Sequence, residues 1–284
     1  MGFLLNRRNA FRSSELGSFS SWKFDITKST FDNVSKTIAA TYFRFLRIID
    51  SGANLVCAGV NGYVYKYAFE TGHEGEINYL ADSYAQRSAN TNNSYSFGAD
   101  ISGKHWLCSH NTQALRVSRV EIDSSFDVAS IPLFNVSASV VDDLPSGSVY
   151  STGLAISNDG TKVYRINSSD GILVQHTLTT PFLLSSASLA MTSVYMTSFG
   201  LAAAYWVSFA FSPDGYRMVF VGENRIHVFD LSVPWDISTM SLTGAFTSAH
   251  KKLQGVCVND DATKMYVSSG EPNAYTIYQY SLSQ

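Results

Sequence analysis

The chain has 284 residues, of which 45% are hydrophobic and only 15% are charged. This is enough for a full core in one large all-β domain or in two ordinary domains. The formal net charge of −3 gives no overall basic character, so we expect no nucleic-acid binding. Ser, Thr, Asn, Gly and Tyr are abundant instead, and this mixture favours strands and turns over amphipathic helices.

The three cysteines, Cys57, Cys108 and Cys257, cannot all pair within one chain, and none lies in a Cys-x-x-Cys motif. We expect buried free thiols, which fits folding in a reducing cytoplasm. No signal peptide is expected, because the apolar run near the N-terminus is too short. The longest apolar run, 200–211, is about half a membrane span, so no membrane insertion is expected.

The first 20 residues lie outside the repeats described below. They combine apolar and basic side chains, namely Phe3, Leu4, Leu5, Arg7, Arg8, Phe11 and Arg12. A chain terminus is commonly a loose tail. The composition also suits a docking arm that binds a partner through an apolar plug and a basic clamp. Both interpretations stay open.

Five copies of one unit follow. Their turn positions are Gly52, Gly103, Gly160, Gly215 and Ala262, so the copies are 47 to 57 residues apart. That spacing suits a propeller blade of four strands. In each copy a short apolar run predicts an inner strand. Asp-Gly or a substitute then predicts a tight turn, because Gly accepts positive φ and the Asp side chain can bond the backbone.

Each copy continues with a second strand and a third, strongly alternating strand. The third strands are predicted at 62–67, 114–117, 172–176, 225–229 and 275–280. A connector of an aromatic, an acidic and an apolar residue comes next. It is clear at 126–128 and 235–237, degraded at 182–184, barely recognisable within 72–77, and present again at 24–26. A more polar outer strand completes the unit.

The fifth copy stops after its third strand, at 278–284, whereas the fourth copy continues. The segment 22–31 reads like the missing continuation, so residues from about Trp22 to Ala40 are predicted to form the outer strand of the last blade. The sequence therefore predicts an all-β fold, a five-bladed β-propeller closed by an N-terminal strand. The predicted domains are a docking arm, 1–20, and a propeller, 21–284.

Two alternative folds compete with this interpretation. A β-sandwich does not explain why the broken repeat is complementary at the two ends of the chain. A degenerate sixth blade within 135–150 or 184–206 stays an alternative.

No catalytic, cofactor-binding or metal-binding constellation is present. Asp159 and Asp214 are expected to be hairpin-turn residues. The acidic pairs 142–143 and 260–261 lack the spacing of a calcium loop, so solvated turns are favoured. His176 and His227 fall on equivalent third-strand positions and are expected to be structural. Glycosidase propellers carry paired carboxylates on their inner strands. The inner strands here are apolar, so we predict no enzyme activity, no cofactor and no metal.

Tyr205 and Trp206 precede an inner strand. They could stack on a sugar, although packing between blades is favoured. A lectin-like propeller, the alternative function, predicts five similar pockets, whereas the loops between these blades differ in length and composition. Further contact surfaces are the loops 109–113 and 268–273.

The fourth copy carries the most specific motif. It combines Phe-Ser-Pro-Asp-Gly at 211–215 with Asp-Leu-Ser-Val-Pro-Trp-Asp-Ile-Ser-Thr at 230–239. This combination resembles the propeller repeats of virion and tail-associated proteins of marine tailed bacteriophages, over roughly half the chain. It does not resemble WD40 repeats, because Trp-Asp opens a connector here and has no Gly-His partner.

The resemblance implies a non-enzymatic structural component of a virion, assembled in the host cytoplasm. It would belong to the tail and adsorption apparatus or decorate the capsid. The implied partners are other virion proteins, bound through the arm, with a host-surface glycan or receptor as a further option.

Overall fold

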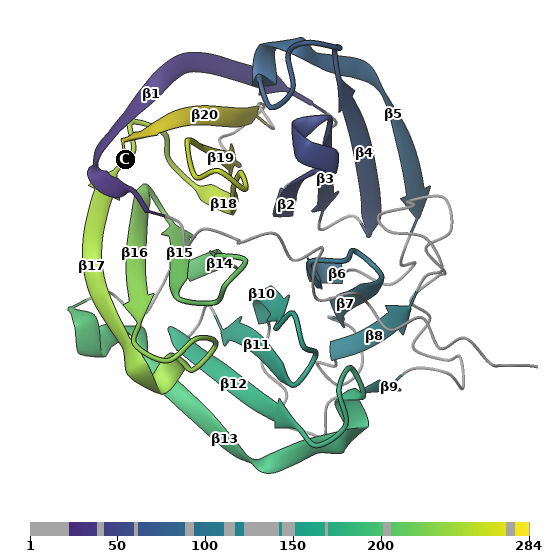
Figure 1. The fold of residues 1–284 in the computed structure, drawn as a ribbon, viewed down its shortest axis with the longest axis vertical. Helices are drawn as coiled ribbons and strands as arrows, with labels where there is room; N and C mark the ends of the chain where they lie inside the picture. The colour runs from purple at the N-terminus through teal and green to yellow at the C-terminus, as the bar shows by residue number, and fades with distance from the viewer. Residues whose placement is uncertain are drawn as a thin grey trace, which may run out of the picture.

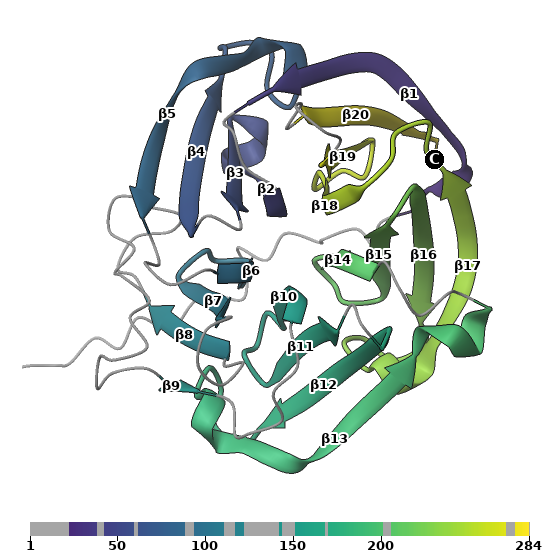
Figure 2. The same cartoon turned by 180° about the vertical axis from the view of Figure 1, so that it is seen from behind.

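The computed structural model describes residues 23–38, 43–59, 62–88, 94–110, 117–121, 142–143, 151–167, 170–200, 206–270 and 276–283. The strands in these ranges form five antiparallel four-stranded sheets around a central axis (Figures 1 and 2). The prediction of an all-β, five-bladed propeller is confirmed. The described part of 184–206 holds no sixth blade, because residues 184–200 belong to the third blade and Trp206 opens the fourth. Most of 135–150 lies outside the described residues.

Within each blade the strands follow one another from the axis outward. The first blade holds β2 (Phe43–Ile49), β3 (Asn54–Gly59), β4 (Tyr63–Phe69) and β5 (Leu80–Ser88). The second holds β6 (Ser94–Ala99), β7 (His105–His110), β8 (Val117–Glu121) and β9 (Asp142–Asp143). The third holds β10 (Ser151–Ile156), β11 (Lys162–Asn167), β12 (Ile172–Leu178) and β13 (Ala187–Tyr195). The fourth holds β14 (Trp206–Phe211), β15 (Arg217–Gly222), β16 (Arg225–Leu231) and β17 (Met240–Thr247). The fifth holds β18 (Leu253–Val258), β19 (Lys264–Ser269), β20 (Thr276–Ser283) and β1 (Asp25–Thr37).

Short 3-10 helices link some of these strands: η1 (Asp50–Gly52), η2 (Ile77–Tyr79), η4 (Leu184–Ser186), η5 (Met196–Phe199) and η6 (Ile237–Thr239). One expectation is wrong in detail, because the acidic pair 142–143, expected in a turn, forms the short strand β9 beside β8.

The ring closes as the split repeat predicts. β1 pairs antiparallel with β20, with Thr37 opposite Thr276 at one end and Asp25 opposite Ser283 at the other. The two ends of the chain thus share one sheet, and the last blade is completed by the first described strand (Figure 1).

The inner hairpin turn and the connector of one blade contact each other. Gly215 has a φ of +77°, and a Cβ built there would lie 2.3 Å from the indole nitrogen of Trp235. Gly160 is covered by Phe182 in the same way. The amide of Trp235 donates to the carbonyl of Gly215 at 2.9 Å. The Asp-Gly turn and the connector aromatic are therefore one packed unit, although they are 20 residues apart in sequence.

The core lies between the blades. Among the described residues, the buried hydrophobic side chains form five clusters, and each cluster joins two neighbouring blades. The cluster between the third and fourth blades, for example, combines Tyr164 and Ile166 with Phe220 and Phe229. Alternating strands have one face to offer each neighbour, so a closed ring of blades buries both faces of every sheet.

Candidate functional site

The inner strands of all five blades meet at the axis of the ring. A cavity of about 90 Å³ is lined by residues of all five inner strands and of the turns that follow them. Strand register gives Arg47, Ala155, Ala210 and Cys257 the same position in four blades, and all four line this cavity. The volume is well below the several hundred Å³ of a typical small-molecule site.

The chemistry at the axis is sparse. Arg47 is half-buried and donates through Nη1 to the carbonyl of Asp100 at 3.3 Å. Burial lowers the pKa of Arg47, and the charges of Asp260 and Asp100 oppose that effect. Burial raises the pKa of Cys257 to about 12, so its thiol stays protonated at neutral pH and is a poor nucleophile.

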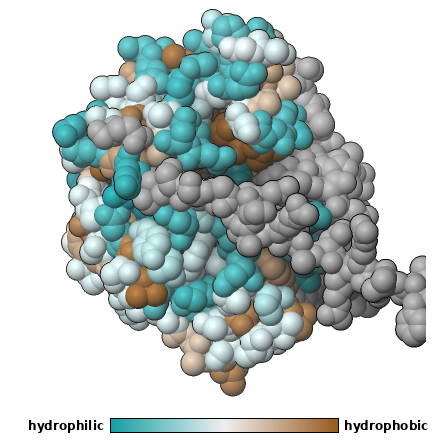
Figure 3. Space-filling model, viewed as in Figure 1, coloured by the Kyte–Doolittle hydropathy of each residue, from teal (hydrophilic) through white to brown (hydrophobic). Residues whose placement is uncertain are grey.

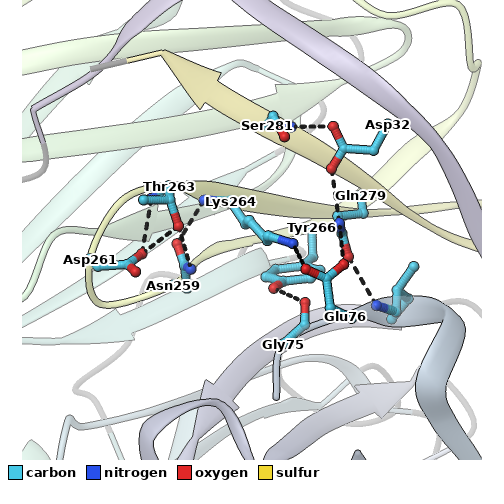
Figure 4. A network of polar contacts seen from close by, with 11 residues as sticks. Asp32, Gly75, Glu76, Asn259, Asp261, Thr263, Lys264, Tyr266, Gln279 and Ser281 are labelled. Carbon is cyan, nitrogen blue, oxygen red and sulfur yellow. Dashed lines mark hydrogen bonds and ion pairs between the residues drawn. The ribbon is translucent and has the colours of Figure 1, made fainter. Parts of the chain in front are cut away.

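A network of polar contacts lies at the closing junction, between the fifth and first blades (Figure 4). Tyr266 of β19 donates its hydroxyl to the carbonyl of Gly75 at 2.5 Å, and burial raises the pKa of this phenol. Gln279 of β20 accepts from the amide of Ile77 at 2.9 Å. Lys264 of β19 pairs with Glu76. Three residues of the fifth blade thus hold the connector of the first.

The N-terminal strand enters the same network. The side-chain amide of Gln279 donates to Asp32 of β1 at 2.8 Å and to Glu76 at 3.2 Å. Asp32 also accepts from the amide of Ser281 at 2.9 Å. A single glutamine therefore ties together the first strand of the chain, the last strand and the first blade, as Figure 4 shows.

The junction between the third and fourth blades repeats this arrangement. Tyr164 of β11 donates to the carbonyl of Trp235 at 2.5 Å, and Lys162 donates to the same carbonyl at 3.1 Å. Gln175 of β12 accepts from the amide of Ile237 at 3.0 Å. Both junctions thus use a lysine and a tyrosine on the second strand and a glutamine on the third. We call this set the connector clamp.

Two further junctions place different side chains at the lysine position. Arg217 donates to the carbonyl of Phe24 at 2.9 Å and is held by Asp230 through contacts of 2.6 and 3.0 Å. His105 stacks on Phe182, with ring centroids 3.8 Å apart. In four blades, the residue two positions after the hairpin turn therefore contacts the connector of the next blade. Lys162 and Arg217 do so by hydrogen bonds, Lys264 by an ion pair and His105 by ring stacking.

The turn aspartates are structural, as expected. Asp214 accepts from the hydroxyl of Ser212 at 2.6 Å and from the amide of Tyr216 at 3.1 Å. Asp159 bonds Ser157 and Thr161 in the equivalent turn. These contacts use the carboxylates inside their own hairpins.

The two histidines lie on third strands, but the prediction that their positions are equivalent is wrong. His176 pairs with Val163, whereas His227 pairs with Phe220, and these positions differ by two residues in register. Both side chains are buried, and burial lowers the pKa of each to about 4. They are therefore neutral in the folded protein at pH 7.

The predicted docking and stacking residues are outside the part of the chain whose side chains the structure describes. The docking arm, with Phe3, Leu4, Leu5, Arg7, Arg8, Phe11 and Arg12, lies outside the described residues, as does Tyr205. Trp206 opens β14, but its side chain is outside the description. The connector clamp was not predicted. Its sequence signal is Lys-x-Tyr at 162–164 and 264–266, followed by glutamine at 175 and 279.

In the part of the chain that the structure describes, no group of three or more His, Cys, Asp or Glu side chains is arranged to hold a metal ion. No helix among the described residues has the length and apolar character that a membrane span requires.

Comparisons with protein-family models and with curated proteins give no match. Among solved structures, the chain is similar to the β-propeller domain of Cps50 (Swd1) from Myceliophteria thermophila. The TM-score is 0.49 and the sequence identity 10%, over 87% of this chain and 98% of that domain. This similarity is too distant to bear on function.

Proposed function

We propose that the chain is a non-enzymatic structural component of a tailed bacteriophage virion, with the propeller displayed outward and residues 1–20 as its anchor. The observation that carries the proposal is the motif in the fourth blade. Its two parts, 211–215 and 230–239, resemble one phage repeat, and in the fold they contact each other through Gly215 and Trp235. The two parts of the resemblance thus belong to one packed unit of the fold.

The axis supports a role without catalysis. Among the described residues that line the cavity, Asp260 is the only carboxylate, whereas glycoside hydrolysis uses two carboxylates on either side of the bond. Cys257 is held as a thiol by burial. The turn aspartates and the connector clamp use their polar groups to fix the ring.

The described ring closes without residues 1–20. Because β1 begins at Asp25, removal of residues 1–20 leaves the closing strand intact.

The test compares the full chain with a variant that lacks residues 2–20, in particles produced by the phage that encodes it. We expect both proteins to have the same thermal unfolding midpoint, and only the full chain to be found in purified particles. Arg7→Glu combined with Arg8→Glu is the matched point variant and should reduce incorporation. Equal incorporation of the truncated chain would show that the anchor lies elsewhere.

The lectin-like alternative gives a different result in the same experiment. A propeller that recognises sugars would bind glycans on an array without residues 1–20. Saturable binding by the truncated chain that is lost in a Trp206→Ala variant would favour this alternative.

A further inference from the structure

One stretch of the chain is free of charge. Between Asp170 and Asp214 the sequence contains no Asp, Glu, Lys or Arg. β13, the outer strand of the third blade, lies in this stretch. Three of its large apolar side chains face solvent: Leu189 is 89% exposed, Tyr195 57% and Met191 46%.

Three of the other outer strands carry charges, which protect against pairing with a further strand. Charges on an edge strand are a common protection, because pairing would desolvate them. β5 and β9 both carry charged residues. β1 carries Asp25, Lys28, Asp32 and Lys36. β17 is also uncharged, but Leu242, at 37%, is its only exposed large apolar side chain, whereas β13 exposes three. β13 has no charge and no proline over nine residues.

The free edge of β13 is regular over its last five residues. From Met191 to Tyr195 the strand pairs residue by residue with β12, from His176 to Ile172. In the described part of the chain no strand pairs with its other edge. Figures 1 and 2 place β13 at the rim of the ring, and the surface of the molecule has brown, apolar residues along its lower rim (Figure 3).

We propose that β13 pairs antiparallel with β13 of a second copy of this chain, about a two-fold axis at Ser193. In this register Ser193 faces its own counterpart, and Met191 faces Tyr195 of the second copy on both sides of the axis. Thioether–aromatic contacts of this kind are favourable. The two third blades would then form one continuous eight-stranded sheet.

The absence of charge is what favours a second copy over a different partner. In a two-fold pairing, a charged side chain near the axis meets its own equivalent, so like charges face each other. An uncharged strand avoids this repulsion. A different partner imposes no such restriction, because its charges could be opposite to those of β13.

The expected association is weak. Five regular residues span about 17 Å of strand, and an interface of this length is smaller than the standard protein–protein interface. We expect a dissociation constant on the order of 10 µM. The inference is independent of the virion proposal, because a propeller could self-associate in any setting.

The first test is sedimentation velocity of the full chain at concentrations that bracket about 10 µM. The native chain should shift from monomer to dimer, and Ser193→Lys should stay monomeric. The matched control is Ala245→Lys, which places the same side chain at the corresponding exposed position of β17 and should still dimerise. Persistent dimers of Ser193→Lys, or a monomeric native chain, would overturn the proposal.

A cross-linking test fixes the register. Opposite residues of an antiparallel pair have Cβ atoms about 5 Å apart, so Ser193→Cys should form a disulfide-linked dimer under mild oxidation after a small shift. The native thiols at 57, 108 and 257 are buried and should not compete. Ala245→Cys is the control. Equal rates of cross-linking for the two variants would place the contact elsewhere.

Discussion

The closing junction and the junction between the third and fourth blades hold the next blade's connector through the same kind of hydrogen bonds. They differ in the side chains that surround these bonds. In both, a tyrosine hydroxyl and a glutamine side chain bond the backbone of the next blade's connector. The internal junction adds Trp235, whose ring covers the turn at Gly215. The closing junction has Gly75 in place of that aromatic, and adds the Glu76–Lys264 pair and Asp32 of β1 instead.

The difference shows which contacts the fold requires. Bonds to the connector backbone recur because that backbone has the same shape in both blades, with positive φ at Gly75 and Trp235. The supports around it vary because side chains have several ways to hold one conformation. An internal junction can rely on a ring from its own blade, whereas the closing junction must also hold the N-terminal strand.

Acidification should have the largest effect on stability, and it should destabilise the third and fourth blades at a higher pH than the closing junction. The folded-state pKa of His176 and of His227 is about 4, below the value of about 6.5 in an unfolded chain. The unfolded state therefore binds protons first, so stability is lost as pH falls from about 6.5 toward 4. At pH 5 each histidine should cost about 2 kcal/mol. Urea unfolding at pH 7 and pH 5 measures the loss.

The closing junction responds at lower pH. Burial raises the pKa of Glu76, but bonds from Lys264 and Gln279 outweigh this, so the pKa is lowered overall. Its contribution is present above the unfolded pKa of about 4.5 and is lost only as pH falls below it. His176→Gln and His227→Gln should therefore flatten the profile between pH 6.5 and 5. An unchanged slope in both variants would contradict this assignment.

The fold could be predicted because its signals are local and repeated. Turn glycines, period-two strands and a repeat split between the two ends are all visible in the sequence. The clamp was missed because it joins residues that are far apart, such as Tyr266 and Gly75, which are separated by 191 positions. Arg217 and His105 also contact connectors from the lysine position with different chemistry, so residue identity gives no signal there.

The histidine error has a physical cause of its own. Third strands alternate with a period of two, so a slip of two residues keeps every side chain on its face. The patterns at 172–176 and 225–229 therefore align equally well in either register. Only the pairing of His176 with Val163 and of His227 with Phe220 fixes their positions.

A methyl group at the turn should break the internal junction. Gly215→Ala places a Cβ within the Trp235 ring at a φ of +77°, so the ring must move with the carbonyl that Tyr164 and Lys162 bond. We expect a loss of about 3–4 kcal/mol from overpacking and backbone strain together. The control is Gly72→Ala, near the first blade's connector. It has a similar φ of +86° with nothing within 4 Å, and should cost about 1 kcal/mol. Equal losses would mean that the contact between the Trp235 indole and the turn does not contribute to stability.

The two glutamines should differ in their contributions. Gln279→Leu removes the acceptor for the buried amide of Ile77 and the donor to Asp32 and Glu76, and should cost about 3 kcal/mol. Gln175→Leu leaves the amide of Ile237 without its acceptor and should cost about 1.5 kcal/mol. Chemical denaturation of both variants measures the difference. A loss for Gln175→Leu as large as that for Gln279→Leu would show that the bond to the N-terminal strand contributes little.

Substitution of either clamp lysine should have the smallest effect on stability of the variants considered. The two effects should differ in their dependence on salt. Lys264 pairs with a carboxylate that is 40% exposed, so Lys264→Met should cost less than about 1 kcal/mol, and about 1 M salt should reduce that cost because it screens the pair. Lys162 bonds a neutral carbonyl, so the cost of Lys162→Met should depend little on salt. Unfolding of both variants at low and high ionic strength measures this. If salt reduces both costs equally, charge is not what distinguishes the closing junction, and the bonds of Gln279 to the N-terminal strand must account for the difference.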